Sequence, residues 1–157
     1  AEYAVIFHAV ALAGGVLTTV NPTYTSGEVH HQLVDSGATR LVTIPAFLET
    51  ATAAIVDSAV KEVYVIGEAD GYASIASLGT SAPLAEQVPV DLDDVVVLPY
   101  SSGTTGLSKG VMLTHRNLVA NLAQTATAIT VTEDKSFVAV LPFFHLYVMQ
   151  GMMDLGR

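Results

Sequence analysis

The sequence predicts an α/β fold in which βαβ units form a largely parallel sheet flanked by helices. Short runs rich in β-branched residues alternate with helix-length segments, first between Val16 and Ile66. The runs are almost continuously apolar, which is typical of strands that are buried on both faces of a parallel sheet. Hydrophobic residues make up 51% of the 157 residues and charged residues 13%, a balance that provides for a large core.

The N-terminal segment predicts a helix followed by a strand. Glu2–Ala13 is apolar nearly all round, and Gly14-Gly15 ends this helix before the β-rich run Val16–Val20. The apolar stretch that starts at Tyr3 is interrupted by His8, and the glycines break it before it reaches the roughly 20 residues that a spanning helix needs. We therefore expect no membrane span.

A capping box marks the second helix. Thr25 precedes the helix, and Glu28 three residues later completes a pattern in which the two residues satisfy each other's free backbone N–H groups. The helix is expected to close near Gly37. A β-branched strand follows at Arg40–Ile44, and Pro45 begins another helix at a position where its missing N–H costs nothing.

The middle of the chain continues the alternation after one irregular stretch. Val63–Ile66 predicts a further buried strand, whereas from Gly67 to Asp94 the pattern weakens, and we expect a surface excursion there rather than a domain boundary. Val95–Leu98 restores a strand, and Val111–Leu113 predicts another. The last expected elements are a helix that Thr114 caps and that reaches about Ala128, a strand at Phe137–Leu141 and an aromatic segment that Pro142 begins.

Composition argues against several classes of function. The net charge of -9 disfavours a nucleic-acid partner, because such a partner rewards clustered Lys and Arg. The absence of cysteine removes disulfides, zinc–thiolate sites and thiol nucleophiles. No basic leading segment opens the chain, so we expect no targeting peptide and a cytoplasmic location. The chain lacks an initial Met and stops within an apolar run, so we expect both ends to be cuts and the chain to be a fragment.

The segment Ser101–Gly110 has the composition of a phosphate-binding loop. It packs three glycines, five hydroxyl residues and one lysine into ten positions. Glycines let successive backbone N–H groups face one concavity, hydroxyl groups add donors to phosphate oxygens, and Lys109 supplies a mobile positive charge. A flexible linker is a poor alternative, because linkers seldom lie between two buried strands. The sequence therefore predicts a glycine-rich phosphate loop between two strands.

Two other loop chemistries share part of this pattern. A Walker loop requires Gly, four residues, Gly, Lys and then Ser or Thr, whereas here Ser108 precedes Lys109 and a glycine follows, so that pattern fails. Gly106–Gly110 matches the Gly-x-Ser-x-Gly elbow of α/β-hydrolases, with Asp134 and His145 following in triad order. The elbow needs a helix directly after its serine, but a strand is predicted here. A serine hydrolase that uses Ser108 is the weaker alternative.

The run YSSGTTGLSKGVMLTH, Tyr100–His115, resembles the phosphate-loop signature of the acyl-CoA synthetase and luciferase superfamily of adenylating enzymes, the AMP-binding family. That family usually carries proline where this chain has Ser108. ALAGGVLTTVNPTYTSGEVHHQLVDSGATRLVT looks like the region upstream of the loop in 4-coumarate:CoA ligases, and LPFFHLYVMQG looks like their acyl-pocket segment. The resemblance covers most of the chain except Gly67–Asp94. It implies a partial N-terminal adenylation domain over residues 1–157, with the small C-terminal domain absent.

The resemblance assigns roles to single residues. It implies that Lys109 and His145 are catalytic and that Gly106 shapes the turn. His145 and Tyr147 would line the site of the acyl adenylate, and Gly151 would lie where side-chain size helps to choose the acyl group. From the residues alone, this aromatic segment is equally consistent with an ordinary core that contains one hydrogen-bonded histidine. The residues implied to contact the ATP phosphates are Ser101, Ser102, Gly103, Thr104, Thr105, Gly106 and Lys109.

The implied activity is the activation of a carboxylic acid by ATP to an acyl adenylate, followed by transfer to coenzyme A, with Mg2+ bridging the ATP phosphates. No metal site made by the protein itself is expected. His30 and His31 are adjacent on a predicted helix and so point apart, which favours solvated surface residues. His115 is expected on the first turn of the helix that Thr114 caps. A non-enzymatic nucleotide-binding or interaction fragment remains the alternative to the ligase.

Overall fold

A computed structural model describes residues 2–80, 82–83, 86–101, 107–128, 142 and 144–145 of the chain. The chain divides into two compact units, which are described separately. The first unit comprises Ala1–Thr19, Gln87–Pro99 and Val111–Arg157. The second comprises Val20–Glu86 and Tyr100–Gly110. No helix among the described residues is long and apolar enough to cross a membrane.

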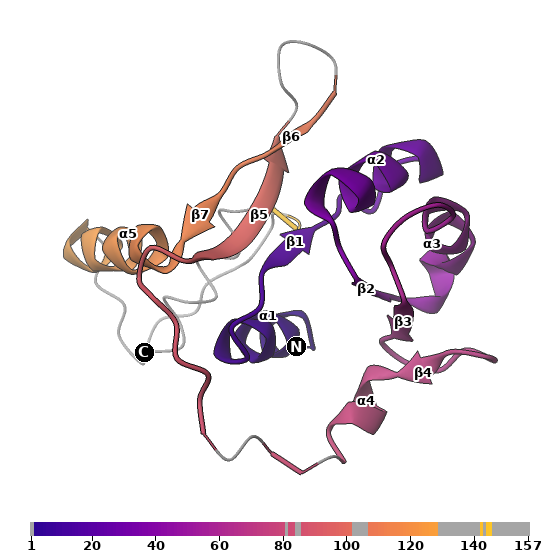
Figure 1. The fold of residues 1–157 in the computed structure, drawn as a ribbon, viewed down its shortest axis with the longest axis horizontal. Coiled ribbons are helices and arrows are strands. Elements are labelled where there is room, and N and C mark those ends of the chain that lie inside the picture. The colour runs from indigo at the N-terminus through magenta and orange to yellow at the C-terminus, as the bar shows by residue number, and fades with distance from the viewer. Residues whose placement is uncertain are drawn as a thin grey trace. The chain divides into compact units, whose positions relative to one another are not determined.

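The first unit contains a parallel strand pair. The short strand β1 pairs in parallel with β5, with Leu17 opposite Val97 and Thr19 opposite Pro99, and β7 pairs with β5 in the antiparallel direction (Figure 1). The Thr18 hydroxyl strengthens the parallel pair by donating to the carbonyl oxygen of Leu98 at 2.7 Å. The elements of this unit are α1 (Glu2–Leu12), β1 (Leu17–Thr19), β5 (Val95–Ser101, of which the last two residues belong to the second unit), β7 (Leu113–Thr114) and α5 (His115–Ala128).

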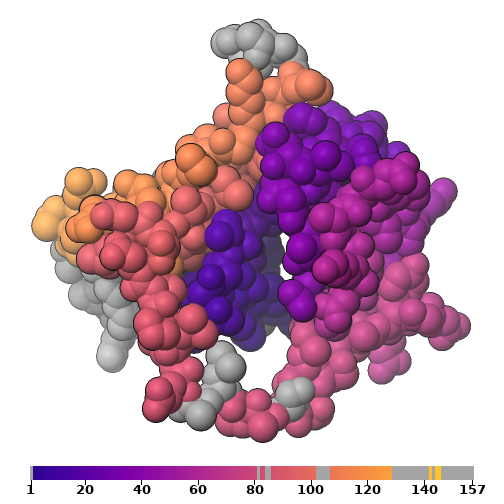
Figure 2. All heavy atoms as spheres, in the orientation of Figure 1, coloured from indigo at the N-terminus to yellow at the C-terminus, as the bar shows by residue number. Residues whose placement is uncertain are grey.

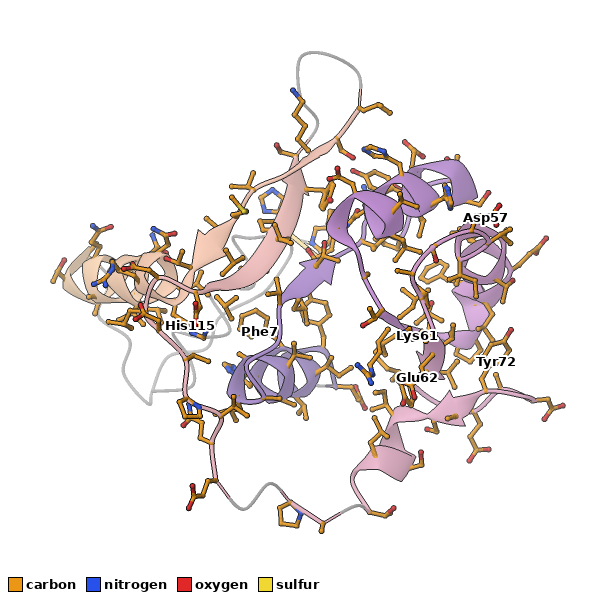
Figure 3. The ribbon with its side chains drawn as sticks, viewed as in Figure 1. Phe7, Asp57, Lys61, Glu62, Tyr72 and His115 are labelled. Atoms are coloured by element: carbon orange, nitrogen blue, oxygen red, sulfur yellow. The ribbon has the colours of Figure 1, made fainter. Side chains whose placement is uncertain are left out.

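The core of the first unit forms where α1 packs against β5. Phe7, which is labelled in Figure 3, is 3% exposed and clusters with Val96 and Val97. The helix ends at its glycines as the sequence predicts, because Gly14 adopts the left-handed φ of 70° and the Gly15 N–H donates to the Val10 carbonyl oxygen at 2.9 Å. The partly buried residues packed on this cluster are Ala11, Leu17, Leu113 and Leu118.

The second unit contains a separate parallel sheet with the strand order β2-β3-β4. Arg40 lies opposite Glu62 at the start of β3, and Val65 lies opposite Ser74 of β4. These parallel strands with helical connections confirm the predicted α/β class, although the strands form two sheets rather than one. The elements of this unit are α2 (Ser26–Ser36), β2 (Arg40–Thr43), η1 (Pro45–Phe47), α3 (Leu48–Ala54), β3 (Glu62–Val65), β4 (Ala73–Ser74), α4 (Ile75–Leu78) and β6 (Lys109–Gly110).

Helix α2 is fixed at both ends by the signals present in the sequence. The Thr25 hydroxyl accepts from the Glu28 N–H at 3.4 Å, and a Glu28 carboxylate oxygen accepts from the Thr25 N–H at 2.8 Å. Gly37 closes the helix at the left-handed φ of 65°. The predicted capping box and C-terminal glycine are therefore confirmed.

The core of the second unit joins α2 to α3. Val29, Leu33 and Ala54 are at most 6% exposed and pack together. Figure 2 shows the purple and magenta spheres of these two helices packed against each other. Because the buried face of α2 is anchored in this way, the helix gives a rigid support for the segments that contact its other faces.

Two sequence predictions need correction, and a third is not tested. Of the strand expected at Val111–Leu113, only Leu113 lies in a strand: β6 (Lys109–Gly110) ends before it, and β7 (Leu113–Thr114) begins at its last residue. The stretch Gly67–Asp94 holds β4 and α4, and the units divide within it between Glu86 and Gln87, so it is more than a surface excursion. The strand predicted at Phe137–Leu141 lies outside the described residues.

Candidate functional site

The glycine-rich segment is closed at its base by a short antiparallel hairpin in the second unit. Tyr100 pairs with Gly110, and Ser101 pairs with Lys109. The two strands therefore bring together the first and last of the residues expected to contact phosphate, which are eight positions apart in the sequence. The other predicted contacts, Ser102, Gly103, Thr104, Thr105 and Gly106, lie outside the described residues.

The paired residues Ser101 and Lys109 project to one face of this hairpin. Directly opposite residues of an antiparallel pair place their side chains on the same face, and both of these residues are exposed. Tyr100 is adjacent to Ser101 in the strand, so its side chain points to the opposite face. A hydroxyl donor and an ammonium group thus share an accessible face of the stem, which is a favourable arrangement for an anionic ligand.

Helix α2 contacts the opposite face of the stem through two polar side chains. The Tyr100 hydroxyl donates to the Asp35 carboxylate oxygen Oδ2 at 2.6 Å. The His31 Nε2 lies 3.1 Å from the carbonyl oxygen of Ser108, to which it donates. His31 and Asp35 are four residues apart and therefore lie on one face of α2. One helix face thus holds the segment just before the glycine-rich loop and the segment just after it.

The environment of Tyr100 keeps its hydroxyl protonated. Burial raises the pKa of the Tyr100 phenol well above its ordinary value, and the hydrogen bond to Asp35 and the negative charge of that carboxylate raise it further. The phenol therefore stays a donor to Asp35 throughout the neutral range. Because the acceptor is a carboxylate, the bond is stronger than one between two neutral groups.

The sequence predicted that the two adjacent histidines of α2 would be solvated surface residues, and this prediction is wrong. Both are half-buried and each is hydrogen-bonded to a main-chain carbonyl oxygen, since the His30 Nδ1 lies 2.9 Å from the Ala54 oxygen. They do point apart as expected, His30 toward α3 and His31 toward Ser108. His115 is the first residue of α5, as predicted, and its N–H donates to the Asp94 carbonyl oxygen at 3.1 Å.

The predicted acyl-pocket residues belong to the first unit where they are described. His145 is exposed and follows a turn in which its N–H donates to the Pro142 carbonyl oxygen at 3.0 Å. The turn is tied to β1, because the Thr19 hydroxyl donates to the Phe144 carbonyl oxygen at 2.8 Å. Tyr147 and Gly151 lie outside the described residues. The structure thus joins Ser101 to Lys109 but places His145 in the other unit.

The local structure at Ser108 does not match a hydrolase elbow. Strand β6 begins at Lys109, directly after this serine, where the elbow requires the start of a helix. Asp134, the second member of the possible triad, lies outside the described residues. Within the part of the chain that the structure describes, no group of three His, Asp or Glu side chains could hold a metal ion.

Sequence reasoning missed the residues that support the loop from behind. His31, Asp35 and Tyr100 were not selected as functional, because their partners lie 77 and 65 positions away in the chain. The only signal available was the spacing of a histidine and an aspartate four residues apart on the exposed part of a helix. That spacing identifies a shared face but not what the face contacts.

Comparison with known proteins gives a consistent family match. The model of the family described as AMP-binding enzyme matches residues 1–153. The 4-coumarate--CoA ligase 5 of Oryza sativa subsp. japonica is 41% identical over 161 residues, which cover 99% of this chain and 29% of the relative. The chain therefore spans less than a third of the length of that relative.

Solved structures share the same fold. The crystal structure of a long-chain-fatty-acid-CoA ligase from Archaeoglobus fulgidus matches 98% of this chain at a TM-score of 0.86 and 33% identity, and this match covers 31% of that chain. The ATP-bound structure of MatB from Rhodopseudomonas palustris matches 98% of this chain at a TM-score of 0.83 and 27% identity, covering 30% of that chain.

Proposed function

The chain belongs to the AMP-binding enzyme family, and from this membership we propose that it is the phosphate-loop segment of an ATP-dependent acid–CoA ligase. The observation that carries the proposal is the stem in which Lys109 lies opposite Ser101, at the base of a loop rich in glycine and hydroxyl residues. The CoA ligases of Oryza sativa and Archaeoglobus fulgidus support the choice of reaction. The ATP-bound MatB structure supports the choice of nucleotide.

In the first proposed reaction, an oxygen of the substrate carboxylate attacks the α-phosphorus of ATP. The bond from that phosphorus to the bridging oxygen breaks, pyrophosphate leaves with the electron pair, and a mixed anhydride of the acid and AMP forms. Negative charge builds on the phosphoryl oxygens during this step. The Lys109 ammonium group, the Ser101 hydroxyl and the N–H groups of the loop would stabilise that charge, because donors that are oriented before the reaction stabilise a developing charge without further rearrangement.

In the second reaction, the sulfur of coenzyme A attacks the acyl carbonyl carbon of the adenylate. The bond from that carbon to the phosphate oxygen breaks, AMP leaves, and the thiol proton passes to water. We assign His145, Tyr147 and Gly151 to the acyl side of the site, as the resemblance implies. We place the reaction in the cytoplasm, where ATP and coenzyme A are supplied.

We propose that Mg2+ would enter with ATP, and we assign no residue of this segment as its ligand. The described residues offer no group of three carboxylates or imidazoles that would hold the ion by itself. When bound with ATP, the ion supplies positive charge to the phosphates. The contribution of this chain is then the hydroxyl, ammonium and main-chain donors of the loop.

Exchange of labelled pyrophosphate into ATP tests the proposed first reaction. The assay uses a full-length ligase that contains this sequence, with a panel of hydroxycinnamic, aryl and fatty acids. We expect acid-dependent exchange, and a loss of about 100-fold in kcat/KM for ATP when Lys109→Ala removes the ammonium group. The matched control is Lys61→Ala, which removes an exposed lysine at the start of the β2–β3 sheet, labelled in Figure 3. Equal activity of the Lys109 and Lys61 variants would refute the assignment.

The isolated segment is expected to bind nucleotide at most, not to complete the reaction. The chain spans 29% of its rice relative, so most residues of such a ligase lie outside it. A nucleotide-binding module without activity is therefore the second candidate for the chain by itself. Acid-dependent exchange by the isolated segment, at a rate near that of a full-length ligase, would exclude this second candidate.

A further inference from the structure

Ser101 and Lys109 form the last described pair of an antiparallel ladder. Strand β6 pairs with β5 at Tyr100–Gly110 and Ser101–Lys109. In the other direction the ladder continues, because the Val111 N–H donates to the Pro99 carbonyl oxygen at 2.9 Å and β7 pairs with β5. The end of a strand pair opens more readily than its middle. A support close to Ser101 and Lys109 therefore helps to keep these two residues in register.

Helix α2 supplies this support at the two positions next to the phosphate-binding residues. Tyr100, held by Asp35, directly precedes Ser101. Ser108, held through its carbonyl oxygen by His31, directly precedes Lys109. The first contact holds the side chain of the residue next to Ser101, and the second holds the main chain of the residue next to Lys109.

The direction of the side chains allows this support without blocking the ligand. Tyr100 points toward α2, whereas Ser101 and Lys109 project to the other face of the hairpin. The helix itself is anchored by Leu33, which is 1% exposed, and by its capping box. The stem is thus joined to the core of the second unit from behind, and its ligand-facing side stays open.

The chemistry of both contacts suits a permanent support. The Tyr100 hydroxyl donates to a charged carboxylate at 2.6 Å, which is the stronger class of hydrogen bond. The His31 ring donates through Nε2 to the main-chain carbonyl oxygen of Ser108 at 3.1 Å, an acceptor that every residue at this position would keep.

We propose that His31 and Asp35 are positioning residues that clamp the two sides of the phosphate loop and thereby set the affinity for ATP. The proposal rests on the ligase function proposed above. The clamp acts on the loop and not on the acid, so its loss weakens the binding of ATP and pyrophosphate and leaves the KM for the carboxylic acid unchanged. A purely structural role would instead lower the fraction of active enzyme, and hence kcat, at unchanged KM.

Pyrophosphate exchange in the full-length ligase tests the clamp. Single-turnover formation of the adenylate measures the concentration of active enzyme. We expect Tyr100→Phe, Asp35→Ala and His31→Ala each to raise the KM for ATP about tenfold, the factor that corresponds to one lost hydrogen bond. His31→Gln keeps a side-chain N–H near the position of Nε2 and should restore most of the affinity. The double variant Tyr100→Phe/Asp35→Ala should be no worse than the more affected single variant, because both remove the same bond.

The matched controls remove the same groups elsewhere in the second unit. Tyr72→Phe removes a phenol hydroxyl near β4, and Asp57→Asn removes a carboxylate after α3, both away from the hairpin (Figure 3). The clamp alone would be overturned if the folded Tyr100→Phe and His31→Ala variants kept the KM for ATP unchanged while the wild type was active and Lys109→Ala showed its expected loss. A wild type without exchange for any acid would overturn the proposed function instead. Equal defects in His31→Gln and His31→Ala would also contradict the clamp.

Discussion

Gly110 lies against the ring of Tyr100 across the stem of the loop. A Cβ atom at Gly110 would lie 3.2 Å from Cε2 and Cζ of the ring and 3.3 Å from its hydroxyl oxygen. Such distances require the ring to shift by a few tenths of an ångström. The ring is not free to shift, because its hydroxyl is bonded to Asp35 at 2.6 Å. The glycine after Lys109 is therefore needed for packing of the stem.

The first prediction is that Gly110→Ala destabilises the second unit and weakens ATP binding. We expect a loss of about 1–2 kcal/mol in the free energy of unfolding, as is usual when a methyl group is forced into a packed site. Denaturant unfolding of the variant measures this loss. Gly27→Ala is the matched control, since nothing lies within 4 Å of a Cβ added there and alanine favours the helix. A fully additive double variant Gly110→Ala/Tyr100→Ala would show that the ring is not the cause.

The second prediction concerns the capping box of α2. Thr25→Ala should lower the free energy of unfolding by about 1 kcal/mol, because it leaves the Glu28 N–H without its acceptor. Thr25→Ser keeps the hydroxyl and is expected to retain most of the stability. Chemical denaturation of the two variants against the wild type measures the difference, and equal losses in both would contradict a capping role.

The same cap predicts a dependence on acid. Hydrogen bonds from the hydroxyl and N–H of Thr25 lower the pKa of Glu28 below its ordinary value of 4.5. Because the pKa of Glu28 is lower in the folded state, its contribution to stability is present above the ordinary pKa of 4.5. This contribution is lost as the pH falls through the lowered pKa. Thr25→Ala should therefore reduce the loss of stability on acidification, which urea titrations at pH 6 and at stepwise lower values, about 5 to 3, can measure.

The elements that the sequence predicted well are those with local signals. Thr25 and Gly37 flank α2, Glu28 lies in its first turn, and Pro45 begins η1 one residue beyond Ile44, after β2 has ended at Thr43. Their effects depend on neighbours a few positions away, so capping and φ preferences are sufficient to predict them. The strands on either side of the glycine-rich segment are present, since β5 ends at Ser101 and β6 begins at Lys109, whereas the phosphate site itself stays a prediction.

The features that the sequence could not predict depend on distant pairing. Val111–Leu113 is apolar enough for a strand, but pairing with β5 determines which residues form one, so β6 ends at Gly110 and β7 begins at Leu113. His30 is half-buried where its Nδ1 is hydrogen-bonded to the carbonyl oxygen of Ala54, 24 positions away in the chain. Side chains such as Asp35 gained a role only once the fold brought Tyr100 to them. Tertiary contacts here override the local pattern.

A third prediction uses the position where this chain departs from the family pattern. The described contact of Ser108 is made by its carbonyl oxygen, which proline also has. Ser108→Pro is therefore expected to keep the His31 contact and to leave the KM for ATP within about twofold of the wild type, while the stiffer backbone adds up to about 1 kcal/mol of stability. Pyrophosphate exchange and denaturant unfolding measure the two effects.

Ser108→Pro also separates the ligase from the hydrolase alternative. If Ser108 were a catalytic nucleophile, Ser108→Pro would abolish hydrolase activity. In the wild type, the serine would react with a fluorophosphonate probe. We expect no stoichiometric labelling at Ser108. Loss of exchange in Ser108→Pro but not in Ser108→Ala would instead show that the loop needs a flexible residue there.

A fourth prediction is that the chain loses stability in alkali through its buried phenols. Burial raises the pKa of Tyr3 to about 12, even though a hydrogen bond with Thr19 lowers it, and burial with Asp35 raises that of Tyr100 still further. Because both phenols ionise more readily in the unfolded chain, stability is fully present below the ordinary value of 10.0 and falls as the pH rises toward the raised values. Tyr3→Phe and Tyr100→Phe should therefore each show a shallower alkaline decline, measured by urea unfolding between about pH 8 and 11. Tyr72→Phe serves as the control, and the prediction fails if all three variants lose stability with the same slope as the wild type.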